Sequence, residues 1–245
     1  MKADPQAQRR LLDLQTIDTT LAQLAHKRKT LPEYAELDRL ARDLSALEDE
    51  RVRVQVGVDD LDRDIARLEK DVDQVRARAA KDQTRLDAGT GPARELEALQ
   101  HELGTLARRQ GELEDAELEL MEQRESAQGT LDEIDQRLIA LRQQRDEVER
   151  RRDEALSEIT RDEEFRRSGR APLSSDLPAD LVALYERIRE QSGIGAALLR
   201  AGRCGACRLE LFGSELSRVK TAPADEVVRC EECGRIMVRT EESGL

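Results

Sequence analysis

The sequence predicts a mainly α-helical protein: a long antiparallel coiled-coil hairpin with a short extra N-terminal helix, followed by a small β-structured module. Three observations predict this fold class. Charged residues make up 38% of the 245 residues, only four residues are aromatic, and apolar residues recur every three or four positions through most of the chain. Because aromatic side chains supply much of the buried area in large cores, so few of them exclude a large globular domain.

The first helix is predicted over about residues 5–31. Its seam carries five apolar residues and one arginine: Leu14, Ile17, Leu21, Leu24, Arg28 and Leu31. Pro32 marks its end, since a proline cannot continue the hydrogen bonding of a helix interior.

The second helix is predicted over about residues 33–87. Thirteen of its fifteen seam positions are apolar, and the positions between them are mostly charged. The seam is Leu37, Leu40, Leu44, Leu47, Arg51, Val54, Val58, Leu61, Ile65, Leu68, Val72, Val75, Ala79, Asp82 and Leu86. A seam sustained over this many heptads is typical of a left-handed coiled coil.

The third helix is predicted over about residues 92–165, after a turn at 88–92 that contains Gly89, Gly91 and Pro92. Fourteen of its nineteen seam positions, from Leu96 to Ile159, are apolar. The short turn and the similar seams favour folding back as a hairpin. The first helix would then cover the part of the return helix that outruns its partner, giving a three-helix base. Parallel pairing between two chains is the alternative that the seams also allow.

Residues 166–178 are predicted to be a linker bracketed by Pro172 and Pro178, and residues 179–245 to be a short helix plus a compact module. The apolar residues Leu181, Leu184, Tyr185 and Ile188 share one face of that short helix. We expect this face to pack the module onto the coiled coil.

Four cysteines lie in the module as two CxxC pairs. They are Cys204 and Cys207, then Cys230 and Cys233. Two such turns can present four thiolates to one tetrahedral metal ion, which points to a Zn²⁺ ion. Four protein ligands leave no position for water, so the metal is expected to be structural. A redox CxxC would favour a βαβ context, and a rubredoxin-type iron site would favour an aromatic-rich core; neither context is present.

Short strands are predicted around the cysteines at residues 196–201, 208–212, 226–229 and 235–239, which makes the module a zinc ribbon. Gly205 and Gly234 are expected to supply the backbone freedom that the two CxxC turns need.

Candidate contacts for RNA, DNA or a partner are basic residues in two places. Between residues 76 and 94 there are five basic and two acidic residues, although the whole chain carries a net charge of −12. A solvated helix end is the simpler interpretation of that run. Residues 200–240 hold eight basic and six acidic residues, so the ribbon is close to neutral once the zinc–thiolate charge is included. The candidates are Arg76, Arg78, Lys81, Arg85, Arg94, Arg203, Arg208 and Arg235.

Enzymatic activity and a small-molecule substrate are not expected. His26 and His101 lie on heptad helices without a nucleophile or carboxylate motif nearby. The N-terminal residues have no apolar core of a signal peptide, and no stretch approaches the length of a transmembrane helix. We therefore expect a cytoplasmic protein with no membrane contact, either monomeric or dimeric.

The chain resembles bacterial coiled-coil hairpin proteins with a C-terminal C4-type zinc ribbon. The matching stretches are ELEALQHEL, LPADLVALYERIREQSGIGAAL, CGACRLEL and CEECGRIMV. The resemblance implies a hairpin with the ribbon at its base, the four cysteines as zinc ligands, and binding of nucleic acid or of a sigma factor.

The function expected from these features is that of a non-enzymatic zinc-ribbon adaptor for nucleic acid, for RNA polymerase or for a sigma factor. A purely protein-binding scaffold, in which zinc only stabilises the ribbon fold, is the alternative.

Overall fold

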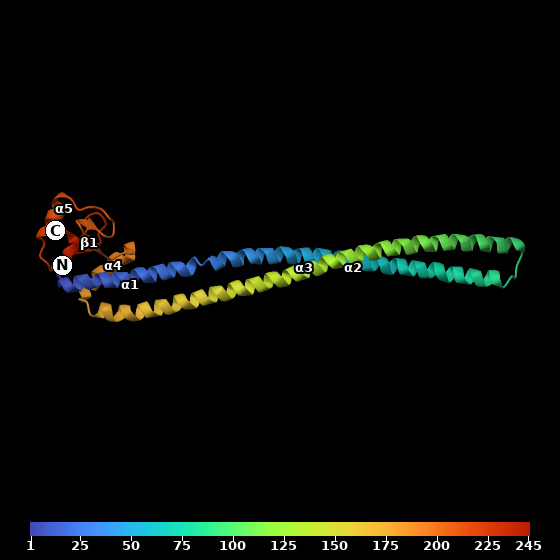
Figure 1. Ribbon diagram of the computed structural model, residues 1–245, viewed down its shortest axis with the longest axis horizontal. Helices are drawn as coiled ribbons and strands as arrows, with labels where there is room; N and C mark the ends of the chain where they lie inside the picture. The colour runs from blue at the N-terminus through green and yellow to red at the C-terminus, as the bar shows by residue number, and fades with distance from the viewer. The chain divides into compact units, whose positions relative to one another are not determined.

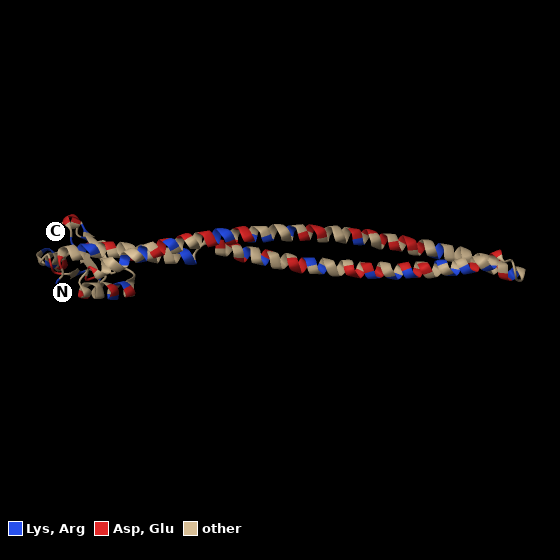
Figure 2. Ribbon diagram, turned by 90° about the horizontal axis from the view of Figure 1, so that it is seen from below, with Lys and Arg blue, Asp and Glu red and all other residues tan.

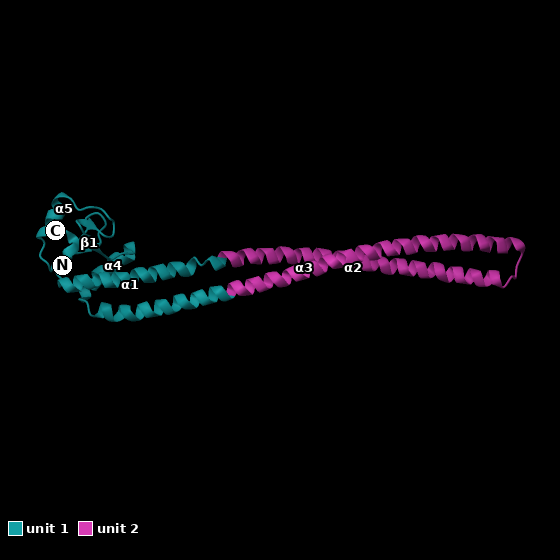
Figure 3. Cartoon of the chain, viewed as in Figure 1, with its two compact units in different colours: residues 1–34, 150–245 teal, residues 35–149 magenta.

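The computed structural model describes all residues, 1–245, and places them in two compact units (Figures 1 and 3). Unit 1 comprises residues 1–34 and 150–245, and unit 2 comprises residues 35–149. The helices are α1 (Pro5–Lys29), α2 (Pro32–Asp87), α3 (Ala93–Ser175), α4 (Ala179–Ser192), α5 (Gly213–Thr221) and the 3₁₀ turn η1 (Glu241–Ser243). The strands are β1 (Ala196–Arg200), β2 (Arg203–Cys204), β3 (Val228–Arg229) and β4 (Ile236–Val238). No helix combines the length and the apolar character needed to cross a membrane.

Unit 2 is an antiparallel two-helix coiled coil. Every predicted seam position of α2, from Leu37 to Leu86, is buried or half-buried, and so is every seam position of α3 within this unit. Leu44 and Leu47 of α2 pack with Ile134 and Leu138 of α3 at the centre of its core. The hairpin within one chain is therefore the correct one of the two arrangements that the seams allow.

The turn of the hairpin lies where the sequence predicts it. Helix α2 ends at Asp87 and α3 begins at Ala93. Gly89 and Gly91 have φ values of +61° and +150°, a region that side chains with a Cβ avoid. Both glycines are thus required by the backbone conformation of this turn.

Polar seam residues are accommodated by ion pairs across one flank of the hairpin. Arg51 Nε lies 2.6 Å from Asp135 Oδ1, and Arg124 Nε lies 3.0 Å from Asp62 Oδ1. Glu48 and Arg142 form a third pair on this flank. These pairs are exposed to solvent, so each stabilises the hairpin only slightly.

In unit 1, α1 runs antiparallel to the last part of α3. Arg28 of α1 pairs with Glu163, and Arg10 pairs with Asp176. Helix α1 therefore covers the excess of the return helix, as expected. The third helix at this level is α4, which contributes Leu181 and Tyr185 to the shared core.

Helix α3 is longer than predicted, which corrects the end expected at residue 165 and the linker expected at 166–178. It runs to Ser175 with Pro172 inside its last turns. The seam continues as Glu163, Arg170 and Leu173, which are buried or half-buried. Because two of these three residues are charged, the apolar repeat fades before the helix ends. Pro172 has a φ compatible with a helix but lacks the N–H that would bond to the preceding turn, and the helix ends three residues later.

The ribbon contains a four-stranded sheet of order β2-β1-β4-β3. Strand β1 pairs parallel with β4, while β1 with β2 and β3 with β4 are antiparallel. Three of the four predicted strands are present in shortened form. The strand predicted at 208–212 is reduced to a single bridge between Glu210 and Arg203, and Arg208 at its start has a φ of +65°, outside the extended region. Helix α5 was not predicted.

The ribbon and the N-terminal helix share one core, so the predicted division into domains 1–165 and 179–245 is wrong for α1. Leu11 and Leu14 of α1 pack with Tyr185 of α4 and with Ile236 and Val238 of β4. Beyond this core, Ala3 N donates to the Asp225 carbonyl at 2.7 Å and Val227 N donates to the Met1 carbonyl at 3.1 Å. The first residues of the chain therefore extend the edge of the ribbon.

A buried polar cluster ties α1, α3, α4 and β1 together. The Asp18 carboxylate accepts two hydrogen bonds from Arg170, at 2.6 and 3.0 Å, and lies 2.8 Å from the Tyr185 hydroxyl. Gln15 Oε1 accepts from Gly195 N at 2.7 Å. A Cβ on Gly195 would lie 2.5 Å from the Tyr185 ring, so this close approach requires glycine.

Tyr185 makes the stability of unit 1 sensitive to alkaline pH. Burial, and next the hydrogen bond to Asp18, raise the pKa of its hydroxyl. In an unfolded chain the tyrosine pKa is about 10. Below about pH 10 the tyrosine is protonated in both the folded and the unfolded chain, and the whole contribution of Tyr185 to stability is present. As the pH rises further, the tyrosine of the unfolded chain ionises first, so this contribution is progressively lost.

We expect the urea midpoint of the native protein to fall more steeply than that of Tyr185→Phe between about pH 9 and pH 11. The exposed Tyr34 is present in both proteins and cancels. Parallel pH profiles of the two midpoints would contradict this assignment.

Candidate metal centre

The two CxxC turns have the same backbone hydrogen bonds. In each turn the carbonyl oxygen of the first cysteine accepts a hydrogen bond from the N–H of the residue four positions later. Arg208 N donates to Cys204 O, and Gly234 N donates to Cys230 O, each at 2.8 Å. The residue after the second cysteine is left-handed in both turns, with φ values of +65° at Arg208 and +69° at Gly234. The expected role of Gly234 is confirmed. In the first turn an arginine occupies the position that glycine favours.

Gly205 is required because of a close contact with strand β1 rather than because of an unusual φ value. Its N–H donates to the Leu198 carbonyl at 2.9 Å, and an added Cβ would lie 2.6 Å from that same oxygen. The first CxxC turn can therefore pack directly onto strand β1 only with glycine at this position.

The four sulfurs are grouped as a tetrahedral ion requires. All of them lie within 4.8 Å of one another, with 3.8 Å between the Sγ atoms of Cys204 and Cys233 and 3.9 Å between those of Cys207 and Cys230. Zn–S bonds of about 2.3 Å in a tetrahedron place sulfurs roughly 3.8 Å apart. The four cysteines therefore fit one structural Zn²⁺ ion, and they complete its coordination.

The environment of the thiols differs between the cysteines. Burial raises the pKa of Cys204 and raises that of Cys230 to about 12. Burial acts in the same direction at Cys233, but hydrogen bonds from the Arg235 backbone N–H and from the other cysteine side chains outweigh it and lower the pKa to about 7. Zinc binds thiolates, so metal binding must displace the protons held by the buried thiols.

Residues on the unpredicted helix α5 support the second CxxC turn. Glu215 Oε1 accepts from Glu231 N at 2.8 Å, and Arg218 pairs with the Glu231 side chain at 3.1 Å. No pattern in the sequence indicates these contacts, because each joins residues about 15 positions apart through a helix that has only nine residues.

Arg239 organises the loop that follows α5. Its guanidinium donates to the backbone carbonyls of Val219, Ala222, Pro223, Ala224 and Glu226, at 2.6 to 3.4 Å. This arginine is thus engaged inside the ribbon and fixes the segment that pairs with the N-terminal residues.

The basic run at the hairpin turn is balanced by the return helix (Figure 2). Arg76 pairs with Glu114 at 2.7 Å, Arg78 pairs with Glu102, and Arg85 lies 3.9 Å from Asp82. When the first turns of α3 are included, residues 76–102 hold five basic and five acidic residues. Lys81 and Arg94 remain without an ion-pair partner, so the turn is not a concentrated basic surface.

Two of the three candidate arginines of the ribbon have partners within the chain. Arg203 pairs with Glu210 at 3.1 Å, and Arg235 donates to Ser192 of α4. Arg208 is exposed without an ion-pair partner. The structure thus brings the four cysteines together, whereas five of the eight basic candidates are engaged with acidic or polar groups of the chain.

Two large apolar side chains are exposed near the first CxxC turn. Leu209 is 52% exposed and Phe212, which precedes α5, is 70% exposed, whereas Leu211 between them is buried. The sequence pattern did not single them out. Two exposed apolar side chains this close in sequence on a small module are candidates for a contact with a partner protein.

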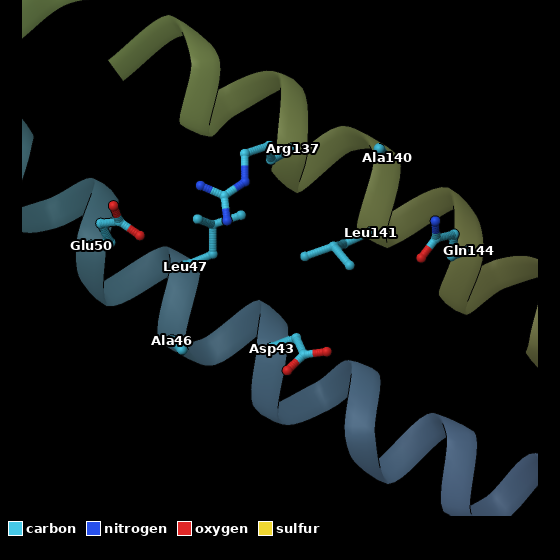
Figure 4. A pocket seen from close by; sticks show the side chains of 8 residues that line it. All are labelled: Asp43, Ala46, Leu47, Glu50, Arg137, Ala140, Leu141 and Gln144. Atoms are coloured by element: carbon cyan, nitrogen blue, oxygen red, sulfur yellow. The ribbon is translucent and has the colours of Figure 1, made fainter. Parts of the chain in front are cut away.

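A pocket of about 450 Å³ lies between α2 and α3 in unit 2 (Figure 4). Leu47 and Leu141 form its floor, with Asp43 and Glu50 on one side and Arg137 on the other. The remaining lining residues are Ala46, Ala140 and Gln144.

Comparison with known proteins gives matches over nearly the whole chain. Residues 14–193 match the CT398-like coiled coil hairpin domain, and residues 203–237 match the C4-type zinc ribbon domain. An uncharacterised protein of Mycobacterium tuberculosis is 40% identical over 241 residues, which cover 98% of both chains.

Two solved structures have the same fold. A Mycobacterium smegmatis protein has a TM-score of 0.86 and 37% identity, with 98% of this chain and 100% of that chain covered. CT398 of Chlamydia trachomatis has a TM-score of 0.67 and 19% identity, with 96% and 98% covered.

Proposed function

This chain belongs to the family of CT398-like coiled-coil hairpin proteins with a C4-type zinc ribbon, and from that premise we propose that it is a non-enzymatic cytoplasmic adaptor. Its ribbon, stabilised by structural zinc, binds a protein of the transcription machinery, such as RNA polymerase or a sigma factor. The transcription assignment rests on the family resemblance described from the sequence.

The exposed pair Leu209 and Phe212 is the observation that carries a binding role for the ribbon. Both side chains lie in the segment that follows the first CxxC turn and leads into α5. A zinc ion with four cysteine ligands has no position for a water molecule, so its role is to stabilise the fold of the ribbon. An apolar contact of this kind favours a protein partner.

Charge also favours protein over nucleic acid. The ribbon's two excess positive charges are offset by the roughly −2 charge of a zinc–tetrathiolate centre. The hairpin turn is balanced, and the whole chain carries −12. Proteins that bind nucleic acid usually concentrate positive charge on one face.

The test is affinity purification of the tagged, full-length protein from its own cells, with and without nuclease. We expect RNA polymerase subunits or a sigma factor to be retained after nuclease and lost with Leu209→Ser/Phe212→Ser. The matched control is Phe165→Ser, which removes an equally exposed phenylalanine from α3 of the same unit.

Other outcomes would redirect the assignment. Partners that vanish with nuclease would make nucleic acid the ligand, and the charge reversal of Arg76, Arg78, Lys81 and Arg85 to Glu would test the hairpin turn next. Retained partners unrelated to transcription would favour the scaffold alternative. Equal retention by the two serine variants would remove the Leu209–Phe212 surface from consideration.

A further inference from the structure

A second apolar surface lies in unit 2, outside the coiled-coil seam. Leu118 and Met121 of α3 are 59% and 49% exposed. Each follows a seam position, Glu117 and Leu120 respectively, so hairpin packing does not account for either side chain. Three residues apart, they project from one side of the helix.

These two side chains and Ile65 of α2 line a groove of about 630 Å³ between the helices. The groove lies on the flank where Asp62 and Arg124 form their ion pair. Glu122 and Glu125 complete its rim, and neither has an ion-pair partner. The groove therefore combines an apolar floor with a rim of net negative charge.

The residues around the groove add to its negative charge. Residues 112–125 contain seven acidic residues and one basic residue. Unit 2 as a whole holds 18 basic and 31 acidic residues, a net charge of −13. A second copy of such a unit would be repelled, whereas a basic partner would be attracted and steered toward the groove.

We propose that this groove binds a basic amphipathic α-helix of a protein partner, with apolar side chains against Leu118, Met121 and Ile65 and with Lys or Arg near Glu122 and Glu125. Helix-in-groove recognition uses this combination of an apolar floor and charged rim. Methionine suits such a floor because its unbranched side chain adapts to the partner. The surface goes beyond the proposed ribbon contact and is tested independently of it.

The probe is a fluorescent synthetic peptide of Leu and Lys, about four helical turns long with Leu on one face, titrated with the full-length protein. At about 0.15 M salt, where long-range charge effects are screened, we expect Leu118→Gln/Met121→Gln to weaken binding about tenfold or more. The matched control Val56→Gln removes an exposed apolar residue of the same unit and should bind like the native protein.

Charge is tested with Glu122→Gln/Glu125→Gln, which should weaken binding and reduce its dependence on salt. A peptide with Glu in place of Lys should not bind. Because all these side chains are exposed, the helical circular-dichroism signal should stay unchanged in each variant.

Several results would overturn the proposal. These are no binding of the Leu–Lys peptide, equal weakening by Val56→Gln, or binding of the Leu–Glu peptide with similar affinity. A native dimer in sedimentation that Leu118→Gln/Met121→Gln dissociates would also overturn it, because a second copy would then occupy the groove.

Discussion

Cys207→Ser is expected to unfold the zinc ribbon while the coiled coil of unit 2 keeps its helical structure. Zinc binding to a small Cys₄ module supplies on the order of 10 kcal/mol of folding free energy, and a serine hydroxyl does not replace a thiolate ligand. The core beneath the metal is small and includes Leu199, Val219 and Met237. Without the metal this core cannot hold the two CxxC turns together.

The damage should extend beyond the ribbon into α1. The sheet shares a core with Leu11 and Leu14, and the residues Met1–Ala3 pair with the loop at 225–227. Hydrogen exchange should therefore accelerate in the ribbon and in the first turns of α1. Unit 2 has its own core around Leu44 and Ile134, so its amides should exchange as before.

A zinc chelator added to the native protein should reproduce the same exchange pattern, which controls for effects of the serine itself. Loss of most of the helical circular-dichroism signal in Cys207→Ser would contradict the independence of unit 2. Unchanged exchange in the ribbon would contradict the role of the metal in its folding.

Asp18→Ala is expected to destabilise unit 1 by about 3–5 kcal/mol, because it removes one partner of a buried charged cluster. The Asp18 side chain is only 3% exposed and contacts Arg170, Arg189 and the Tyr185 hydroxyl. Without the carboxylate, two neighbouring guanidinium groups remain close together with only Glu186 between them.

Urea unfolding followed by the near-ultraviolet circular dichroism of tyrosine measures this loss, since Tyr185 is fully buried in unit 1. The matched control is Asp176→Ala, which breaks an Arg–Asp pair of the same unit, formed with Arg10, whose side chains are 41% and 62% exposed. We expect that control to change stability by no more than about 1 kcal/mol. Similar losses from the two substitutions would show that burial does not set the strength of the Asp18 cluster.

Local patterns determine the hairpin and the metal site. The seam from Leu37 to Leu86, the glycines at 89 and 91, and the returning seam from Leu96 fix helix, turn and partner helix through contacts that repeat every heptad. The two CxxC pairs determine the zinc ligands, because each turn is built from adjacent residues. Such features can be predicted since their physical causes lie within a few positions of one another.

Where the repeat is replaced by polar residues, prediction fails for an identifiable reason. Glu163 and Arg170 hold seam positions that an apolar pattern does not reveal, and they are stabilised by Arg28 and Asp18, more than 130 positions away. Helix α5 and the left-handed Arg208 depend in the same way on contacts within the folded ribbon.

The sequence alone thus determined the two long coiled-coil helices, the turn between them and the four zinc ligands, and it favoured the hairpin over pairing between two chains. Only the tertiary structure decided that α1 belongs with the ribbon, that the basic run is balanced by the return helix, and that Leu118 and Met121 line an acidic groove. The physical reason is that these features arise between side chains distant in sequence, whose burial and charge partners are set only when the helices and the sheet pack together.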